Sequence, residues 1–179
     1  MSDEKPDIDE TRRVSSDYVQ RAAERLGVPV GNNLFIRPVI EFVHQNYNVL
    51  EVVAEAISAK EPQVIANQAD ALQMKIGALG LPVVDGKARE ANNPAWLEKT
   101  ETGDWRLAID QSATGGKNSV FLKELVHEWG AWFLIKYLRF EDKSQLIQIK
   151  AASENKMIPQ THMVDAVLLL MVKDRETTA

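Results

Sequence analysis

The segment 163–172 near the carboxyl end, MVDAVLLLMV, constrains the fold most, because Asp165 is its one polar residue. A helix on the surface of a protein normally carries a polar face at 3.6-residue spacing, and this segment has almost none. The predicted helix, about residues 162–173, is also far shorter than the ~20 residues that cross a bilayer. Protein must therefore cover it on more than one side, either as the centre of the core or as a self-association surface. The candidate interface residues are Val164, Val167, Leu168, Leu169, Met171 and Val172.

Five further segments are predicted to be helices from apolar residues at three- and four-residue steps. They cover about residues 16–26, 34–45, 49–59, 62–79 and 119–140. Asn48 and Glu51 match a capping box that would open the third of them, and Pro62 suits the first position of the fourth. The expected buried face of the third helix consists of Val49, Val52, Val53, Ala56 and Ile57.

Residues 96–109 predict a β-hairpin. Trp105, Leu107 and Ile109 alternate with their neighbours in a two-residue period, and Gly103 supplies a tight turn before them. A short strand is also considered at Val83 and Val84. All four tryptophans lie between residues 96 and 132. We therefore expect one aromatic core in which Trp105 packs on the long helix, with an exposed aromatic contact surface as the alternative.

These elements predict a mainly α fold, a compact multi-helix domain with one β-hairpin at about residues 96–109. Residues 1–13 are acid-rich and are expected to form a disordered arm. Residues 14–175 are expected to form a single helical domain, with 81–95 as the candidate internal boundary because it is rich in turn residues. Segment 143–152 fits a helix or a strand, and we interpret it as a helix.

Composition excludes several classes of protein. With 21 basic and 26 acidic residues the net charge is −5, which argues against a broadly basic nucleic-acid coat. The absence of cysteine excludes disulfides, thiolate metal sites and cysteine nucleophiles, and it fits a cytoplasmic protein. The opening MSDEKPDIDETRR lacks the apolar region of a secretory signal, and no apolar run is long enough to suggest a membrane span.

The familiar catalytic motifs fail on inspection. His127-Glu128 begins a zinc-protease pattern, but position 131 is Ala131 where a second histidine would be required. Gly115-Gly116-Lys117 precedes a helix but lacks the other residues of a phosphate-binding loop. No Gly-x-Ser-x-Gly elbow occurs. We therefore expect no metal, no cofactor and no catalytic residue that the sequence alone can name.

The helices at 49–59 and 62–79, followed by the string LEKTETGDWRL at residues 97–107, resemble a winged helix-turn-helix module in their order. This resemblance, over the middle third of the chain, implies DNA binding by residues 69–79 and the hairpin. Residues 69–79 carry only one base, Lys75, and one acid, Asp70, so this helix would hold phosphates weakly. The candidate anion or nucleic-acid contacts are Lys87, Arg89, Lys99, Arg106 and Lys117.

Taken together, these patterns favour a non-enzymatic helical protein-interaction, adaptor or regulatory protein that acts through apolar helix surfaces. A protein partner or a second copy of the chain would bind there. A winged-helix-like DNA-binding regulator is one alternative. An enzyme whose site is assembled from residues distant in the sequence is the other, since one sequence cannot pair such residues.

Overall fold

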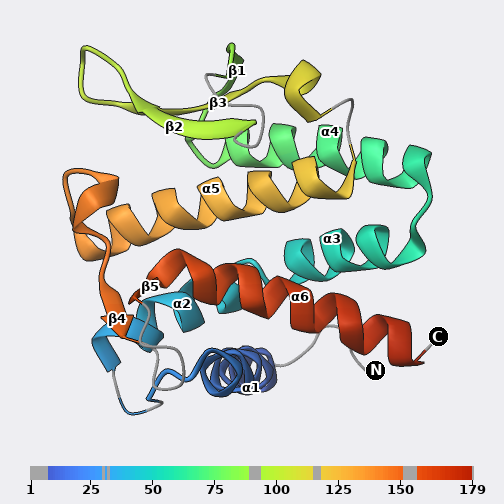
Figure 1. Cartoon of the computed structure of the whole chain (residues 1–179), viewed down its shortest axis with the longest axis vertical. Helices are drawn as coiled ribbons and strands as arrows, with labels where there is room; N and C mark the ends of the chain where they lie inside the picture. Colours follow the sequence, from blue (N-terminus) through green and yellow to red (C-terminus); the bar gives the residue numbers. More distant parts are fainter. Residues whose placement is uncertain are drawn as a thin grey trace.

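The computed structural model describes residues 8–29, 31, 33–88, 94–114, 118–150 and 157–178, and within these it is mainly helical (Figure 1). This confirms the expected compact multi-helix fold. In Figure 1 the α4–α5 layer lies between a small sheet and a layer that holds α3 and α6, with α2 beside α6 and α1 on the far side. The helices are α1 (Ile8–Leu26), α2 (Asn33–Gln45), α3 (Tyr47–Ala59), α4 (Pro62–Ala78), α5 (Ser119–Leu138) and α6 (Gln160–Thr178).

Helix α6 is the centre of the core, since it packs against α1, α2, α3 and α5. Five of the six candidate interface residues on it, all except Leu169, are buried by those helices, so they cannot meet a partner. The interface assignment is therefore wrong for these five, and the core alternative holds for them. Leu169 alone of the six remains 50% exposed. No helix in the described part of the chain is long and apolar enough to cross a membrane.

The predicted hairpin is confirmed and belongs to a three-stranded sheet. Strand β2 (Ala95–Lys99) pairs antiparallel with β3 (Trp105–Ile109), and Gly103 in the turn between them has a φ of 87°. Strand β1 (Val83–Asp85) adds to β3 in parallel, which makes β3 the central strand. Leu107, Ala108 and Ile109 are consequently all buried, where a two-residue alternation had been expected.

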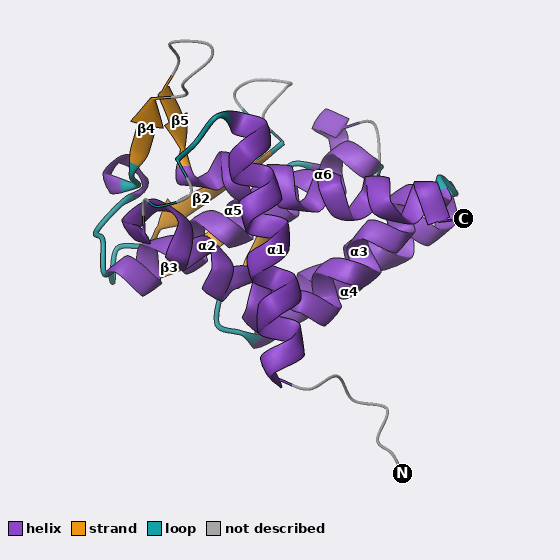
Figure 2. Ribbon diagram, turned by 90° about the horizontal axis from the view of Figure 1, so that it is seen from below, coloured by secondary structure: helices purple, strands orange, loops and turns teal. Residues whose placement is uncertain are grey.

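Within the expected helix 143–152, residues 143–150 do not form an α-helix, and residues 151–152 lie outside the described residues. Lys143–Gln145 forms a short 3-10 turn, and β4 (Gln148–Lys150) then pairs antiparallel with β5 (Met157–Pro159). Asp142 caps the start of this turn, where its side chain accepts a hydrogen bond from the main-chain N–H of Ser144 at 2.9 Å. Figure 2 shows this second sheet at the opposite end of the helical body from the last turn of α6.

Two helix starts differ from expectation. Helix α1 begins at Ile8, so residues 8–13 of the expected arm are helical, while residues 1–7 lie outside the described residues. An ion pair between Arg12 and Glu41 at 2.5 Å ties this early turn to α2. The capping box is also wrong, because α3 begins one residue earlier than Asn48 and Asn46 precedes it. Asn46 donates its side-chain amide to the carbonyl of Phe42 in the last turn of α2 at 2.9 Å and makes no capping hydrogen bond to α3.

A buried glutamine compensates for the proline inside α2. Pro38 has no main-chain N–H, so the carbonyl of Leu34 lacks its usual helical donor. The side-chain amide of Gln160, which is fully buried at the start of α6, donates to the carbonyls of Leu34 and Phe35, each at 3.2 Å. Its oxygen accepts the main-chain N–H of Ile147 at 3.1 Å. One side chain thus joins α2, α6 and the segment before β4.

The expected aromatic core forms in part. Trp129 and Trp132 on α5 are buried, and Trp129 meets Phe42 of α2 edge to face at a centroid distance of 5.0 Å. Trp105 is only partly buried, and the ammonium of Lys99 lies 5.3 Å from its ring centroid. The candidate boundary at 81–95 stays a prediction, and residues 89–93 within it lie outside the described residues.

Candidate functional site

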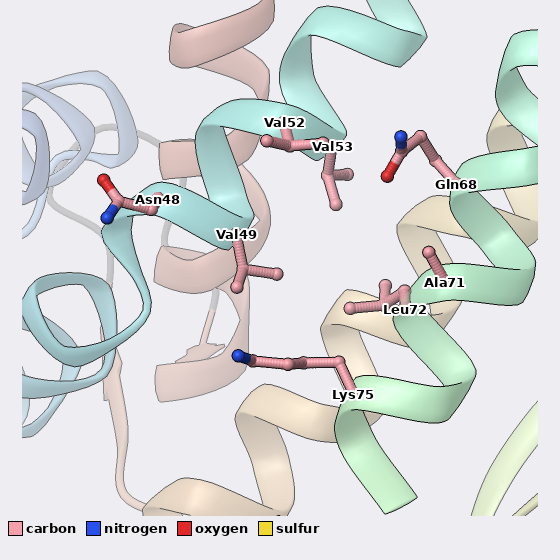
Figure 3. Close-up of a pocket in the computed structure, with 8 residues that line it drawn as sticks. All are labelled: Asn48, Val49, Val52, Val53, Gln68, Ala71, Leu72 and Lys75. Atoms are coloured by element: carbon pink, nitrogen blue, oxygen red, sulfur yellow. The ribbon is translucent and has the colours of Figure 1, made fainter. Parts of the chain in front are cut away.

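An apolar groove lies on the surface between α3 and α4, with a volume of about 260 Å³ (Figure 3). Val49 and Val53 point from α3 toward α4, while Lys75 extends from α4 across one end of the groove (Figure 3). The two walls are consecutive helices joined by a short turn, which explains why they pack side by side at one end. The lining consists of Asn48, Val49, Val52, Val53, Gln68, Ala71, Leu72 and Lys75.

The floor of the groove consists of buried apolar side chains, and its rim consists of exposed ones. Val53 and Leu72 form the floor and are 1% and 3% exposed. Val52 on the rim is 45% exposed, and Ala71 opposite it is also exposed. Exposed apolar side chains that gather around a concave surface are typical of binding sites, whereas isolated ones are ordinary. The groove is therefore a candidate docking surface.

Sequence reasoning missed this groove because it placed Val49, Val52 and Val53 on one buried face. The structure buries Val53 but leaves Val52 exposed and Val49 half-buried. A signal was present: α3 carries more apolar residues than one helix face can bury. Leu50, which is not among those three valines, is also buried, on the side of α3 that packs toward the core. The excess of apolar residues on α3 was the clue to a second, uncovered surface.

A polar cleft of about 250 Å³ lies between α5 and α6, and it brings together residues that no sequence motif had paired. The Nδ1 atom of His127 lies 2.9 Å from each carboxylate oxygen of Asp165. Burial alone would lower the pKa of His127, but the hydrogen bond and the charge of Asp165 outweigh it, so this pKa is raised. Lys123, Glu124, Leu168 and Leu169 complete the lining of the cleft.

Two glutamates of α5 lie beside this pair in different surroundings. Burial raises the pKa of Glu124, and the negative charges nearby raise it further. Glu128 is 2% exposed and accepts a hydrogen bond from the ammonium of Lys143 at 3.0 Å. Within the described residues, no group of three or more His, Cys, Asp or Glu side chains could hold a metal ion. The cleft is therefore an acid–base cluster in which Asp165 orients His127.

Of the residues proposed for anion contact, the structure describes Lys87, Lys99 and Arg106, and it engages two of these three within the chain. Arg106 pairs with Glu98 through its Nε atom at 2.7 Å, and the Lys99 ammonium donates to the carbonyl of Glu141 at 2.7 Å. Lys87 is exposed. Arg89 and Lys117 lie outside the described residues. The DNA-binding alternative thus stays a prediction, with two of its contacts already engaged within the chain.

No family model, curated protein or solved structure matches this chain. The function must therefore be argued from the groove and the cleft themselves.

Proposed function

We propose that this chain is a helical protein-interaction module whose α3–α4 groove receives apolar side chains of a protein partner. The observation that carries the proposal is the apolar rim, in which Val52 and Ala71 stay exposed on either side of a buried apolar floor. A side chain the size of leucine that fills such a site gains about 1.5–3 kcal/mol from burial. The groove is large enough for more than one such side chain.

The groove suits this role better than the apolar face of α6, which the sequence suggested as the interface. All the candidate interface residues of α6 except Leu169 are occupied by contacts with neighbouring helices, whereas Val52 faces solvent. An adaptor or regulatory role would follow from the identity of the partner. The acid–base cluster around His127 supports the enzyme alternative less, because no nucleophilic hydroxyl side chain is among the residues that line its cleft.

Site-specific photo-crosslinking tests the proposal. A benzophenone amino acid at Val52 on the groove rim is compared with the same group at Val120, a somewhat more exposed valine on α5 that does not line the groove. We expect a discrete protein adduct from position 52 that survives nuclease treatment and is absent at position 120. The adduct should disappear when Ala71→Glu places a charge on the opposite rim.

Two results would count against a docking groove. Adducts of equal intensity from positions 52 and 120 would indicate nonspecific contact. An adduct at position 52 that persists with Ala71→Glu would place the partner elsewhere. As a control for folding, Ala78→Glu introduces the same charge at an exposed position on the same helix outside the groove, and it should leave the adduct unchanged.

A further inference from the structure

Lys75 gives the groove a charge at one end. It is the one charged residue among the eight described residues that line the groove, and its side chain is exposed. No ion pair with a described residue engages its ammonium. Figure 3 shows the ammonium beside Val49, at the edge of the apolar lining. A ligand that fills the groove would therefore meet an apolar surface and then a cation.

The walls of the groove favour a helical ligand. Both walls are α-helices, whose main-chain groups bond within their own helix and offer little to an extended peptide. A peptide entering an apolar groove must satisfy its own main-chain groups, and a helix does so. The lining residues of α4 lie at positions 68, 71, 72 and 75, so the groove runs along about two helical turns.

From this geometry we propose that the occupant is an amphipathic helix of a protein partner, with apolar residues at three- and four-residue steps along the groove and an aspartate or glutamate facing Lys75. This inference rests on the proposed function and adds the chemistry of the partner. A small apolar molecule suits the groove less well, because the exposed rim at Val52 and Ala71 would leave much of its surface in water. A helix covers the rim as well as the floor.

The test is a selection of 18-residue helical peptides displayed on phage, carried out in parallel against the wild-type chain and Lys75→Glu. Against the wild type we expect helices with an apolar stripe and an acidic residue at one fixed position beside it. Against Lys75→Glu the same position should favour lysine or arginine. The control Lys173→Glu, at an exposed lysine of α6 outside the groove, should select the wild-type pattern.

Affinities of one selected peptide then quantify the contact. Lys75→Met should weaken binding about two- to fivefold, which is the range of an exposed ion pair. A peptide with lysine in place of its acidic residue should bind Lys75→Glu more tightly than it binds the wild type. This charge exchange isolates the pair from the rest of the groove.

Three outcomes would overturn the inference. Apolar helices selected without any acidic preference, or with the same preference against Lys75→Glu, would contradict the charged contact and leave the proposed groove function standing. A wild-type dimer in light scattering that Ala71→Glu converts to a folded monomer would assign the groove to a second copy of the chain. Selected peptides whose binding is unaffected by Ala71→Glu would contradict both the inference and the proposed function.

Discussion

His127 on α5 and Asp165 on α6 are joined by a hydrogen bond of 2.9 Å in the cleft between the two helices, although 38 positions separate them in the chain. Because Asp165 raises the pKa of His127, the folded chain holds the imidazolium proton more tightly than the unfolded chain does. The resulting stabilisation is fully present below the unfolded pKa of about 6.5 and is lost as the pH rises through the folded pKa. The pair thus links the contact between α5 and α6 to proton binding.

We expect Asp165→Asn to remove this pH dependence. The substitution should lower the free energy of unfolding by about 1–2 kcal/mol below pH 6 and by less at alkaline pH, since it removes a hydrogen bond to a charged group. Urea denaturation across this range measures the effect. The same comparison in a Glu124→Gln background removes the contribution of Glu124, the other group of the cleft whose pKa is raised. Parallel pH profiles for the wild type and Asp165→Asn would contradict the linkage.

Gln160 is expected to stabilise the fold by supplying the donor that Pro38 cannot. Gln160→Leu should cost about 1–3 kcal/mol, because it leaves buried carbonyl groups without a partner. In a Pro38→Ala background the loss should be smaller, since a main-chain N–H restored at position 38 can reach the carbonyl of Leu34. Chemical denaturation of the four proteins gives the coupling energy. Strictly additive losses would show that the two residues act independently.

Gly130 allows α5 and α6 to approach closely. A Cβ atom at this position would lie 3.0 Å from a methyl carbon of Val164, so a larger side chain forces the helices apart. Gly130→Leu should therefore destabilise the chain by about 1–3 kcal/mol through overpacking. Gly77 is the matched control: it also lies in a helix but has open space around it, and Gly77→Ala should stabilise by up to about 1 kcal/mol. Equal effects at both glycines would contradict this account.

The tryptophans should differ in their contributions to stability. Trp129 is 1% exposed and packs on Phe42, so Trp129→Ala should cost about 3–5 kcal/mol. Trp105 is partly buried under the Lys99 side chain, and Trp105→Ala should cost only about 1–2 kcal/mol. Thermal and chemical unfolding of both variants measures the difference. A larger loss of unfolding free energy for Trp105→Ala than for Trp129→Ala would support the single aromatic core that the sequence predicted.

Local signals account for the parts of the fold that could be predicted. Pro62 begins α4, and Gly103 marks the turn of the hairpin. These effects act within a few residues, so periodicity and turn chemistry reveal them. The strand Gln148–Lys150 could not be predicted in the same way, because it depends on pairing with Met157–Pro159.

The candidate sites depend on contacts between distant residues, and this is why they were missed. Glu128 is buried, and its charge is met by Lys143, which reaches back to it from beyond the end of α5. The exposure of Val52 depends on how far α4 diverges from α3, which helical periodicity does not encode. A single sequence specifies which residues are apolar, but it does not specify which apolar helix faces are buried by a neighbouring element.

The central claim, that the α3–α4 groove is the docking surface, is tested most directly by nuclear magnetic resonance of the full chain. Amide shifts are followed while a helical peptide selected against the wild type is added to ¹⁵N-labelled protein. We predict that the largest changes fall on Val49, Val52, Ala71 and Lys75, with little change at His127 and Asp165. Changes centred on the α5–α6 cleft or on the hairpin, with the groove unaffected, would contradict the account.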